Sequence, residues 1–249
     1  MEFQRIHPTP GRVDSAELFG DLALGARAHE ERPWLVTNFA TTVDGRAAID
    51  GRSGAIGDEG DTELFRRLRT QVDALLVGTG TLATERYGRI VRAAELRAAR
   101  EAIGLAPDPP VVTVSRSGVL PYDIPLFADP DSTVLVFTTP DAPEPPPTAA
   151  TVRLMRLDPA ELTLTTVLRQ LRAEHGIRSV LCEGGPTLFG SLLHERLVDE
   201  LFLTFASLLA GGGSGPTMTS GAPLPDPAEL ELVWALERRS SLYLRYALR

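Results

Sequence analysis

Short apolar runs that end abruptly at glycine or small polar residues limit the fold of this chain more than any other feature. Residues 74–77, 111–115 and 179–182 are such runs, and each leads into a turn-forming segment. Because their apolar residues do not alternate with polar ones, the runs indicate strands buried on both faces of a parallel sheet. Helical spacing of apolar residues occurs between them, at about 61–70, 93–103, 162–174 and 187–195. This alternation predicts an α/β fold with an open sheet and helices on both faces.

The remaining segments complete this outline. Further strands are predicted at 34–41, 133–138, 199–206 and 242–248, and the last alternates as an antiparallel edge strand does. Residues 1–32 are more polar, and we expect an N-terminal arm with a short helix there. Residues 33–249 are expected to form a single domain. The prolines at 140–147 predict an exposed loop rather than a domain boundary.

Charge and cysteine content exclude several classes of protein. With 25 basic against 33 acidic residues, the net charge is −8, whereas sequence-independent nucleic-acid binding needs a basic surplus. Cys182 is the only cysteine, which excludes a disulfide framework and a multi-cysteine zinc site. The histidines lack metal-ligand spacing, and no apolar stretch reaches the ~20 residues of a membrane helix. We therefore expect a soluble, cytoplasmic protein without a metal, a membrane anchor or a nucleic-acid partner.

Three predicted strands lead into small or glycine-rich turns, at residues 78–81, 115–118 and 183–187. In open α/β sheets, ligands lie at the carboxyl ends of strands, where helix N-termini offer N–H groups to phosphate. Three such turns in one chain indicate a dinucleotide site. Residues 78–83 match the G-x-G-x-x-A pattern of dinucleotide-binding turns. However, the next strand does not end in the acidic residue that binds the ribose hydroxyl of NAD. Ser115 and Arg116 stand there instead, which suits the 2′-phosphate of NADPH unless Arg116 is simply a solvated surface residue.

Five short motifs occur in order along the chain. They are TTVDGRAA at 41–48, LRTQVDA at 68–74, TGT at 79–81 with Glu85, EGGPTL at 183–188 and LVDEL at 197–201. They resemble, respectively, S-[LV]-D-G-[KR]-x-A, L-R-[AS]-x-x-D-A, the cofactor turn, E-G-G-[PA]-x-L and L-[VI]-D-E-L of one family. That family is the reductase domain of bifunctional riboflavin-pathway deaminase-reductases. The resemblance extends from about residue 33 to the C-terminus.

The resemblance implies a dihydrofolate-reductase-like three-layer fold, with a mostly parallel central sheet, an antiparallel C-terminal edge and helices on both faces. It also implies a homodimer that uses NADPH to reduce the ribosylamino side chain of a phosphorylated aminopyrimidine to a ribitylamino group. A deaminase domain is missing, because the sequence has no H-x-E followed by P-C-x-x-C. A stand-alone reductase is therefore expected.

The resemblance also assigns site residues. Glu183 and Asp44 would be catalytic, and Asn38, Ser53, Arg69, Arg89 and Arg92 would bind substrate. The cofactor set would be Ala40, Gly78, Thr79, Gly80, Thr81, Glu85, Ser115, Arg116, Gly184, Gly185, Pro186, Thr187 and Leu188.

Each of these roles has a structural alternative. Glu183 could cap a helix, Asp44 could belong to a plain hairpin turn, and the run containing Arg89 and Arg92 could be a solvated face. Asn38 stands where bifunctional relatives carry lysine, so the resemblance does not fix the identity of the substrate. Reduction of dihydrofolate or another pterin is one alternative function, and a non-catalytic NADPH-binding module is another.

Overall fold

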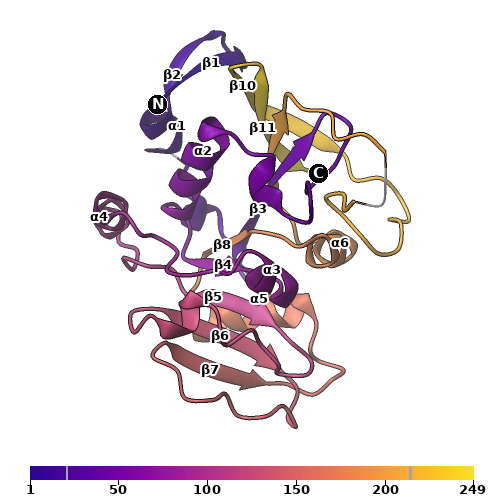
Figure 1. Ribbon diagram of the computed structural model, residues 1–249. Helices are drawn as coiled ribbons and strands as arrows, with labels where there is room; N and C mark the ends of the chain where they lie inside the picture. Colours follow the sequence, from indigo (N-terminus) through magenta and orange to yellow (C-terminus); the bar gives the residue numbers. More distant parts are fainter. Residues whose placement is uncertain (21, 213–214) are drawn as a thin grey trace. The chain divides into compact units, whose positions relative to one another are not determined.

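The computed structural model describes residues 1–20, 22–212 and 215–249, which divide into two units of several segments each. The first unit comprises Met1–Ala23, Leu35–Leu68 and Cys182–Arg249. The second comprises Leu24–Trp34 and Arg69–Leu181. Both ends of the chain, indigo and yellow in Figure 1, therefore belong to the first unit. The predicted division into an arm of residues 1–32 and a domain of residues 33–249 stays a prediction.

The first unit contains strands in the order β2-β1-β10-β11-β9-β3. Their bounds are β1 Glu2–His7, β2 Gly11–Asp14, β3 Trp34–Thr42, β9 Glu200–Ala206, β10 Leu230–Arg238 and β11 Ser241–Leu248. β3 and β9 run parallel, whereas the other neighbours pair antiparallel. The helices of this unit are α1 Ser15–Gly20, α2 Glu59–Arg69 and α6 Pro186–His194, with a 3₁₀ turn at Ser53–Ala55.

The second unit contains strands in the order β8-β4-β5-β6-β7. Their bounds are β4 Ala74–Leu76, β5 Val111–Val114, β6 Thr133–Thr138, β7 Thr151–Arg156 and β8 Ser179–Cys182, whose last residue belongs to the first unit. β4, β5, β6 and β7 are all parallel, and β5, β6 and β7 lie side by side in Figure 1. The helices are α3 Thr79–Thr84, α4 Ala94–Ala102 and α5 Leu164–Glu174, with 3₁₀ turns at Leu24–Arg27 and Pro125–Ala128.

The structure confirms the α/β class, with parallel strands in the middle of the chain and antiparallel strands at its C-terminal end. The predicted strands and helices all occur, with ends that shift by no more than two residues. Four strands and a helix were not predicted, namely β1, β2, β7, β10 and α3. The predicted arm thus contains, besides the short helix α1, two strands that extend the antiparallel sheet beyond β10.

Helix α2 begins where its side chains satisfy its first amide groups. The Asp58 carboxylate accepts the N–H of Asp61 at 2.9 Å, as an N-cap residue does. The same carboxylate accepts the Tyr243 hydroxyl at 2.7 and 2.8 Å, which ties the start of α2 to β11. Leu64 and Leu68 follow at helical spacing and are buried. α2 therefore covers the antiparallel sheet with its apolar face.

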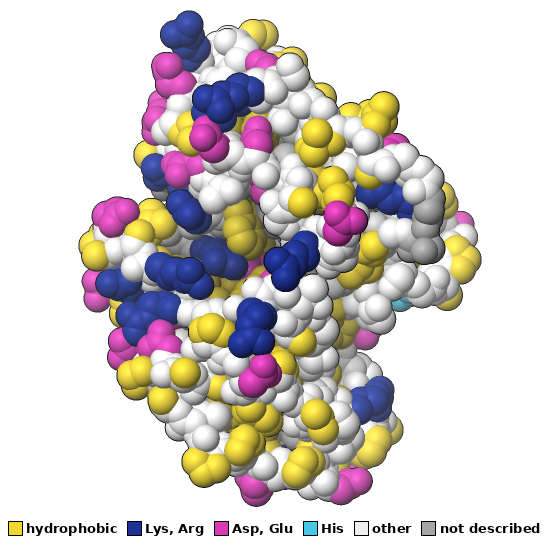
Figure 2. All heavy atoms as spheres, in the orientation of Figure 1, with side chains coloured by type: hydrophobic (Ala, Val, Ile, Leu, Met, Phe, Trp, Pro, Cys, Tyr) yellow, Lys and Arg dark blue, Asp and Glu magenta, His cyan; other side chains and the backbone are white. Residues whose placement is uncertain are grey.

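The basic side chains of this protein are all arginines, because the sequence contains 25 basic residues and no lysine. Figure 2 shows many of them gathered on the displayed face, although the net charge is −8. A guanidinium group presents five N–H donors in a planar fork and stays charged when partly buried. Such groups can therefore bind backbone carbonyls as well as carboxylates inside the fold.

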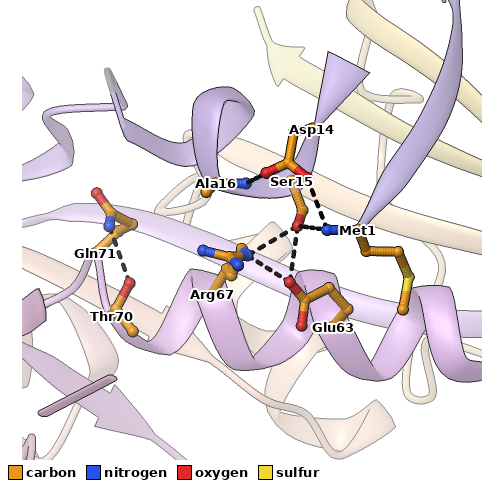
Figure 3. Close-up of polar contacts among 8 residues, drawn as sticks. All are labelled: Met1, Asp14, Ser15, Ala16, Glu63, Arg67, Thr70 and Gln71. Carbon is orange, nitrogen blue, oxygen red and sulfur yellow. Dashed lines mark hydrogen bonds and ion pairs between the residues drawn. The ribbon is translucent and has the colours of Figure 1, made fainter. Parts of the chain in front are cut away.

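The N-terminal segment is fastened to α2 by a polar network (Figure 3). The Met1 ammonium group donates to Asp14 Oδ2 at 2.8 Å and to Ser15 Oγ at 3.1 Å. Ser15 Oγ donates to Glu63 Oε1 at 2.7 Å, and Arg67 Nε donates to both of these oxygens. Ser15 is fully buried, so these bonds replace water that it has lost.

A buried ion pair joins β9, which carries the end of the LVDEL motif, to β11. Glu200 on β9 is completely buried, and its two carboxylate oxygens accept Arg245 Nε and Nη2 of β11, each at 2.9 Å. Asp199 Oδ2 accepts the N–H of Leu35 at 2.7 Å. This motif therefore fixes β9 against both of its neighbours rather than supplying a reacting group.

Removing the charge of Glu200 should strongly destabilise the protein. In Glu200→Gln, the Arg245 guanidinium stays buried without a counter-charge, which should lower the free energy of unfolding by about 3–5 kcal/mol in urea denaturation. Glu231→Gln is the matched control, because its partner Arg249 and Glu231 itself are 62% and 57% exposed. That change should cost less than about 1 kcal/mol. Equal losses in the two variants would contradict the account.

Candidate functional site

The predicted site residues fall in both units. In the second unit, the register pairs Leu75 with Val111 and Leu76 with Val112 on parallel strands. The carboxyl ends of β4 and β5 therefore lie at the same edge of the sheet. The turn at 78–81 follows β4, and Ser115 follows β5. The structure thus brings together two of the three predicted cofactor turns.

The turn after β4 forms the start of α3. Gly78 is the N-cap residue with extended backbone, and Thr79, Gly80 and Thr81 form the first turn. The first-turn N–H groups of a helix have no partner within the helix. A Cβ placed on Gly80 would meet no atom within 4 Å, so open space faces it. Glu85 lies at the C-terminal end of α3, where its N–H donates to the Thr81 carbonyl at 3.0 Å.

The segment after β5 presents one buried hydroxyl and one exposed cation. Ser115 is 8% exposed, and its Oγ donates to the Val119 carbonyl at 3.3 Å. Arg116 is exposed and donates to the Pro159 carbonyl at 3.2 Å. Thr139 Oγ1 donates to the Arg116 carbonyl at 2.9 Å, which fixes the backbone of this turn. No carboxylate in the described part of the chain pairs with Arg116. Its guanidinium group can therefore bind an anion.

Arg69 lies beside the segment that carries Arg92. Arg69 is the last residue of α2, its Nη1 donates to the Ile90 carbonyl at 3.2 Å, and its Cζ lies 5.8 Å from the centre of the Tyr87 ring. Arg92 follows Ile90 by two residues and is exposed. A Cβ on Gly88 would lie 3.3 Å from Arg92 Nη2, so the guanidinium lies over the preceding loop. Tyr87 was not singled out from the sequence, because a single tyrosine in a loop carries no pattern.

Arg89 is held by two carboxylates. Its Nε and Nη2 donate to Asp129 at 2.8 and 2.9 Å, and Nη2 also pairs with Asp131. The hydrogen bonds to Asp129 and then to Asp131 raise the pKa of Arg89 above its usual range. Arg86 pairs in the same way with Asp123 at 3.0 Å. These ion pairs tie the loop after α3 to the loop before β6, and the role of Arg89 toward substrate stays a prediction.

In the first unit, β3 presents alternate residues to opposite faces. The Phe39 ring packs against Phe189 of α6, with ring centres 4.8 Å apart. Asn38, which is partly exposed, instead lines a small pocket. The other lining residues are Phe19, Leu64, Leu68, Phe202, Leu203, Thr204, Trp234, Tyr243 and Leu244. Ala40 is likewise partly exposed on β3, on the same side as Asn38.

Glu183 lies just before the turn that opens α6. It is 9% exposed, and Gly184 follows with φ of +97°, a conformation that favours glycine. Gly185 is the N-cap residue of α6 and Pro186 occupies its first turn. Glu183 therefore does not occupy the N-cap position of α6.

The start of α6 suits an anion. The N–H groups of Thr187 and Leu188 lie in the first turn of a nine-residue helix, where the helix provides no acceptor and its dipole favours negative charge. Thr187 Oγ1 lies 3.0 Å from Ser220 Oγ. These amides therefore fit a phosphate group.

Asp44 holds a loop in place. Its Oδ1 accepts the Thr42 hydroxyl at 2.5 Å and the N–H of Ala210 at 3.1 Å, and its Oδ2 accepts the N–H of Gly211 at 2.7 Å. The Thr42 hydroxyl first, and then the Ala210 N–H, lower the pKa of Asp44 to about 2. Asp44 is therefore ionised at neutral pH and cannot donate a proton there. Its contribution to catalysis stays a prediction, and Thr42 is a partner that the motif alone did not reveal.

Ser53 begins the 3₁₀ turn at Ser53–Ala55, and its carbonyl accepts the N–H of Ile56 at 2.9 Å. Its predicted role toward substrate also stays a prediction. Within residues 1–20, 22–212 and 215–249, no group of His, Cys, Asp and Glu side chains could hold a metal ion. No helix in the same residues is long and apolar enough to cross a membrane.

Comparison with curated proteins gives named relatives. A 2,5-diamino-6-ribosylamino-4(3H)-pyrimidinone 5′-phosphate reductase from Archaeoglobus fulgidus is 30% identical over 207 residues, covering 81% of this chain and 93% of that protein. The equivalent reductase from Methanothermobacter thermautotrophicus is 28% identical and covers 88% of this chain and 99% of that protein. The riboflavin biosynthesis protein RibD of Mycobacterium tuberculosis is 32% identical over 74% of this chain, but only 46% of its own length is covered.

Solved structures share the fold. A pyrimidine reductase-like protein from Corynebacterium diphtheriae superposes with a TM-score of 0.75 at 23% identity, over 95% of this chain and 99% of that one. The riboflavin biosynthesis reductase of Saccharomyces cerevisiae superposes with a TM-score of 0.70 at 20% identity, over 95% of this chain and 100% of that one. At these identities the likeness shows the fold alone.

The family comparison covers most of the chain. The model of the RibD C-terminal domain matches residues 33–241. This span contains all five sequence motifs and every predicted site residue. The chain therefore belongs to the riboflavin-biosynthesis pyrimidine reductase family, that of the RibD C-terminal domain.

Proposed function

We propose that this protein is an NADPH-dependent reductase that converts the ribosylamino side chain of a phosphorylated aminopyrimidine into a ribitylamino group. The observation that carries the proposal is the match to an archaeal 2,5-diamino-6-ribosylamino-4(3H)-pyrimidinone 5′-phosphate reductase, 93% of whose length is covered. The relative named for this reaction thus has no additional large domain that this chain lacks. The proposal extends its substrate class to this chain.

The cofactor is NADPH in this proposal, and it supplies the hydride. Amides at the start of α3 would hold its pyrophosphate, since the first turn of this helix offers N–H groups. Arg116, exposed and without a carboxylate partner among the described residues, would bind the 2′-phosphate. The buried hydroxyl of Ser115 would add a second polar contact at the same turn.

The remaining residues would orient the substrate and manage its proton. Arg69 and Arg92 would bind the substrate phosphate, for which guanidinium groups are suited by their forked donors. Glu183, largely buried at a strand end, would hold a proton of the substrate as its ribose opens, which leaves C1′ electrophilic. Asp44 would keep the segment at 208–211 in place rather than exchange a proton.

The proposal includes a homodimer. Ile6, Leu230 and Leu242 on β1, β10 and β11 are 48%, 45% and 38% exposed, so apolar side chains of the antiparallel sheet face outward. A second copy could cover them.

Glu183→Gln should lower kcat by about a hundredfold or more, because the amide keeps the shape of the side chain but cannot exchange a proton. The KM for NADPH should stay close to that of the unmodified protein. Glu174→Gln is the control, because Glu174 is exposed at the end of α5. Steady-state oxidation of NADPH with the pyrimidine phosphate measures both. A Glu183→Gln enzyme that retains most of its kcat would contradict the proton role.

Arg116→Gln should weaken the preference for NADPH over NADH about tenfold, the size of one lost charge-assisted hydrogen bond. The change should appear in kcat/KM for NADPH, and kcat/KM for NADH should be unaffected. Arg153→Gln on exposed β7 serves as the matched control. An unchanged ratio of the two cofactors would remove the assignment of Arg116.

Asp44→Asn should show a pH-dependent loss of stability. The folded-state pKa of about 2 lies below the ordinary value of 3.8, so the ionised carboxylate is the form that the fold stabilises. This contribution is fully present above the unfolded pKa and is lost as the pH falls through the folded pKa. The gap in urea midpoint between the unmodified protein and Asp44→Asn should therefore shrink between about pH 4 and pH 2. A constant gap over that range would count against the hydrogen-bonded carboxylate.

A further inference from the structure

We propose that Arg97 and Arg100 of α4 are positioning residues for the anion-binding arginines Arg69 and Arg92. Both would act by binding backbone carbonyls of the segments that carry those two residues. The inference rests on the proposed function, because it names what keeps the substrate's phosphate site in shape. Neither α4 arginine would touch the substrate.

Arg100 binds the chain at the end of α2. It is fully buried, and its Nη1 donates to the carbonyl of Arg69 at 2.5 Å and to that of Val72 at 2.7 Å. Its Nε donates to the carbonyl of Ala106 at 2.7 Å. The last carbonyls of a helix have no partner within the helix, and a cation there is favoured by the helix dipole. Arg100 therefore fixes the backbone of the residue whose side chain is predicted to bind phosphate.

Arg97 binds the segment that carries Arg92. It lies one helical turn before Arg100, and its Nη1 donates to the carbonyl of Val91 at 3.1 Å and to that of Arg92 at 2.6 Å. Asp108 Oδ1 accepts the N–H of Val91 at 2.7 Å. Both the N–H and the C=O of Val91 are thus bound by side chains, so the backbone around Arg92 is fixed without help from a strand or helix.

The two segments are also joined directly. Arg69 Nη1 donates to the carbonyl of Ile90 at 3.2 Å. Ile90 directly precedes Val91, whose N–H the Asp108 carboxylate accepts. One helix therefore controls both segments, and one of the two predicted phosphate ligands contacts the backbone leading to the other. A displacement of about 1 Å at a binding group can reduce activity strongly, so these carbonyl contacts bear on substrate affinity.

A similar arginine elsewhere in the second unit separates positioning from stability. Arg156 of β7 donates through Nη1 to the carbonyls of Pro140 at 2.8 Å and Ala142 at 2.7 Å. It fastens the proline-rich loop, which carries none of the predicted substrate ligands. Arg156→Met therefore removes carbonyl contacts of the same kind without affecting the segments of Arg69 and Arg92.

The test compares Arg97→Met, Arg97→Lys, Arg100→Lys and Arg156→Met in the full chain. For each variant, kcat and KM are measured with the phosphorylated aminopyrimidine and with the same compound lacking its phosphate, alongside urea stability. Arg97→Met should raise KM for the phosphorylated substrate about tenfold and change kcat less than about twofold. KM for the compound without phosphate should not change. Arg97→Lys, which can still donate to a carbonyl, should recover most of the loss, whereas Arg156→Met should leave both KM values unchanged.

Arg100→Lys guards against misfolding, because it keeps the buried charge but cannot reach three carbonyls with a planar fork. It should give the same selective rise in KM. If Arg97→Met and Arg100→Lys both behave as Arg156→Met does, or if KM rises equally for both compounds, the inference is overturned.

Calorimetric titration with ribose 5-phosphate measures binding without catalysis, and it separates this inference from the proposed function. If the unmodified protein reduces no pyrimidine phosphate, the proposed function fails, but Arg97→Met should still weaken ribose 5-phosphate binding about tenfold. Equal binding by the two proteins, or no binding by the unmodified one, would overturn the positioning role.

Discussion

Backbone groups at the ends of helices and strands must find partners, and in this protein arginine side chains bind many of the carbonyls that regular structure leaves over. The chain has 25 basic residues and no lysine. Arg100 and Arg156 each bind several carbonyls, in different parts of the second unit. A lysine ammonium group could not match these contacts, because it offers a compact point charge rather than a planar fork. The loops that surround the candidate site therefore owe their shape to side chains rather than to regular structure.

Parallel strand pairing supplies the other part of the site. The register of β4 with β5 places the Gly80 turn and the Ser115 turn at one edge of the sheet. Amide groups gathered at such an edge favour phosphate. The first unit has comparable amide groups at the start of α6, which follows the buried Glu183 along the chain. In the proposed function, phosphate binding and proton handling thus fall to residues next to the ends of strands and the starts of helices.

The parts of the fold that follow from the sequence are those with an unambiguous apolar pattern. β6 and β8 have the predicted bounds because continuous apolar residues leave no other reading. β1 and β7 were not predicted because at least half of the residues in each are polar or charged and each lies toward the edge of its sheet. Such strands are stabilised by pairing with a neighbour, which a local pattern does not reveal.

The sequence predicted candidate residues of the site but not the groups that their side chains contact. The motif around Glu183 predicted a strand end followed by a helix, as observed. The sequence did not indicate that Arg89 pairs with Asp129, 40 positions away, or that Asp44 binds the backbone of Ala210 and Gly211. These contacts join segments that are distant along the chain, so only the folded structure brings them together.

The central claim is that the protein transfers a hydride to the sugar side chain of a phosphorylated pyrimidine. Mass spectrometry of the reaction products tests it most directly. With NADPH and the ribosylamino pyrimidine phosphate, the account predicts a product that has gained one hydride and one proton, on the ribose-derived carbon chain. Recovery of unchanged pyrimidine from a reaction in which the same protein reduces dihydrofolate would contradict it.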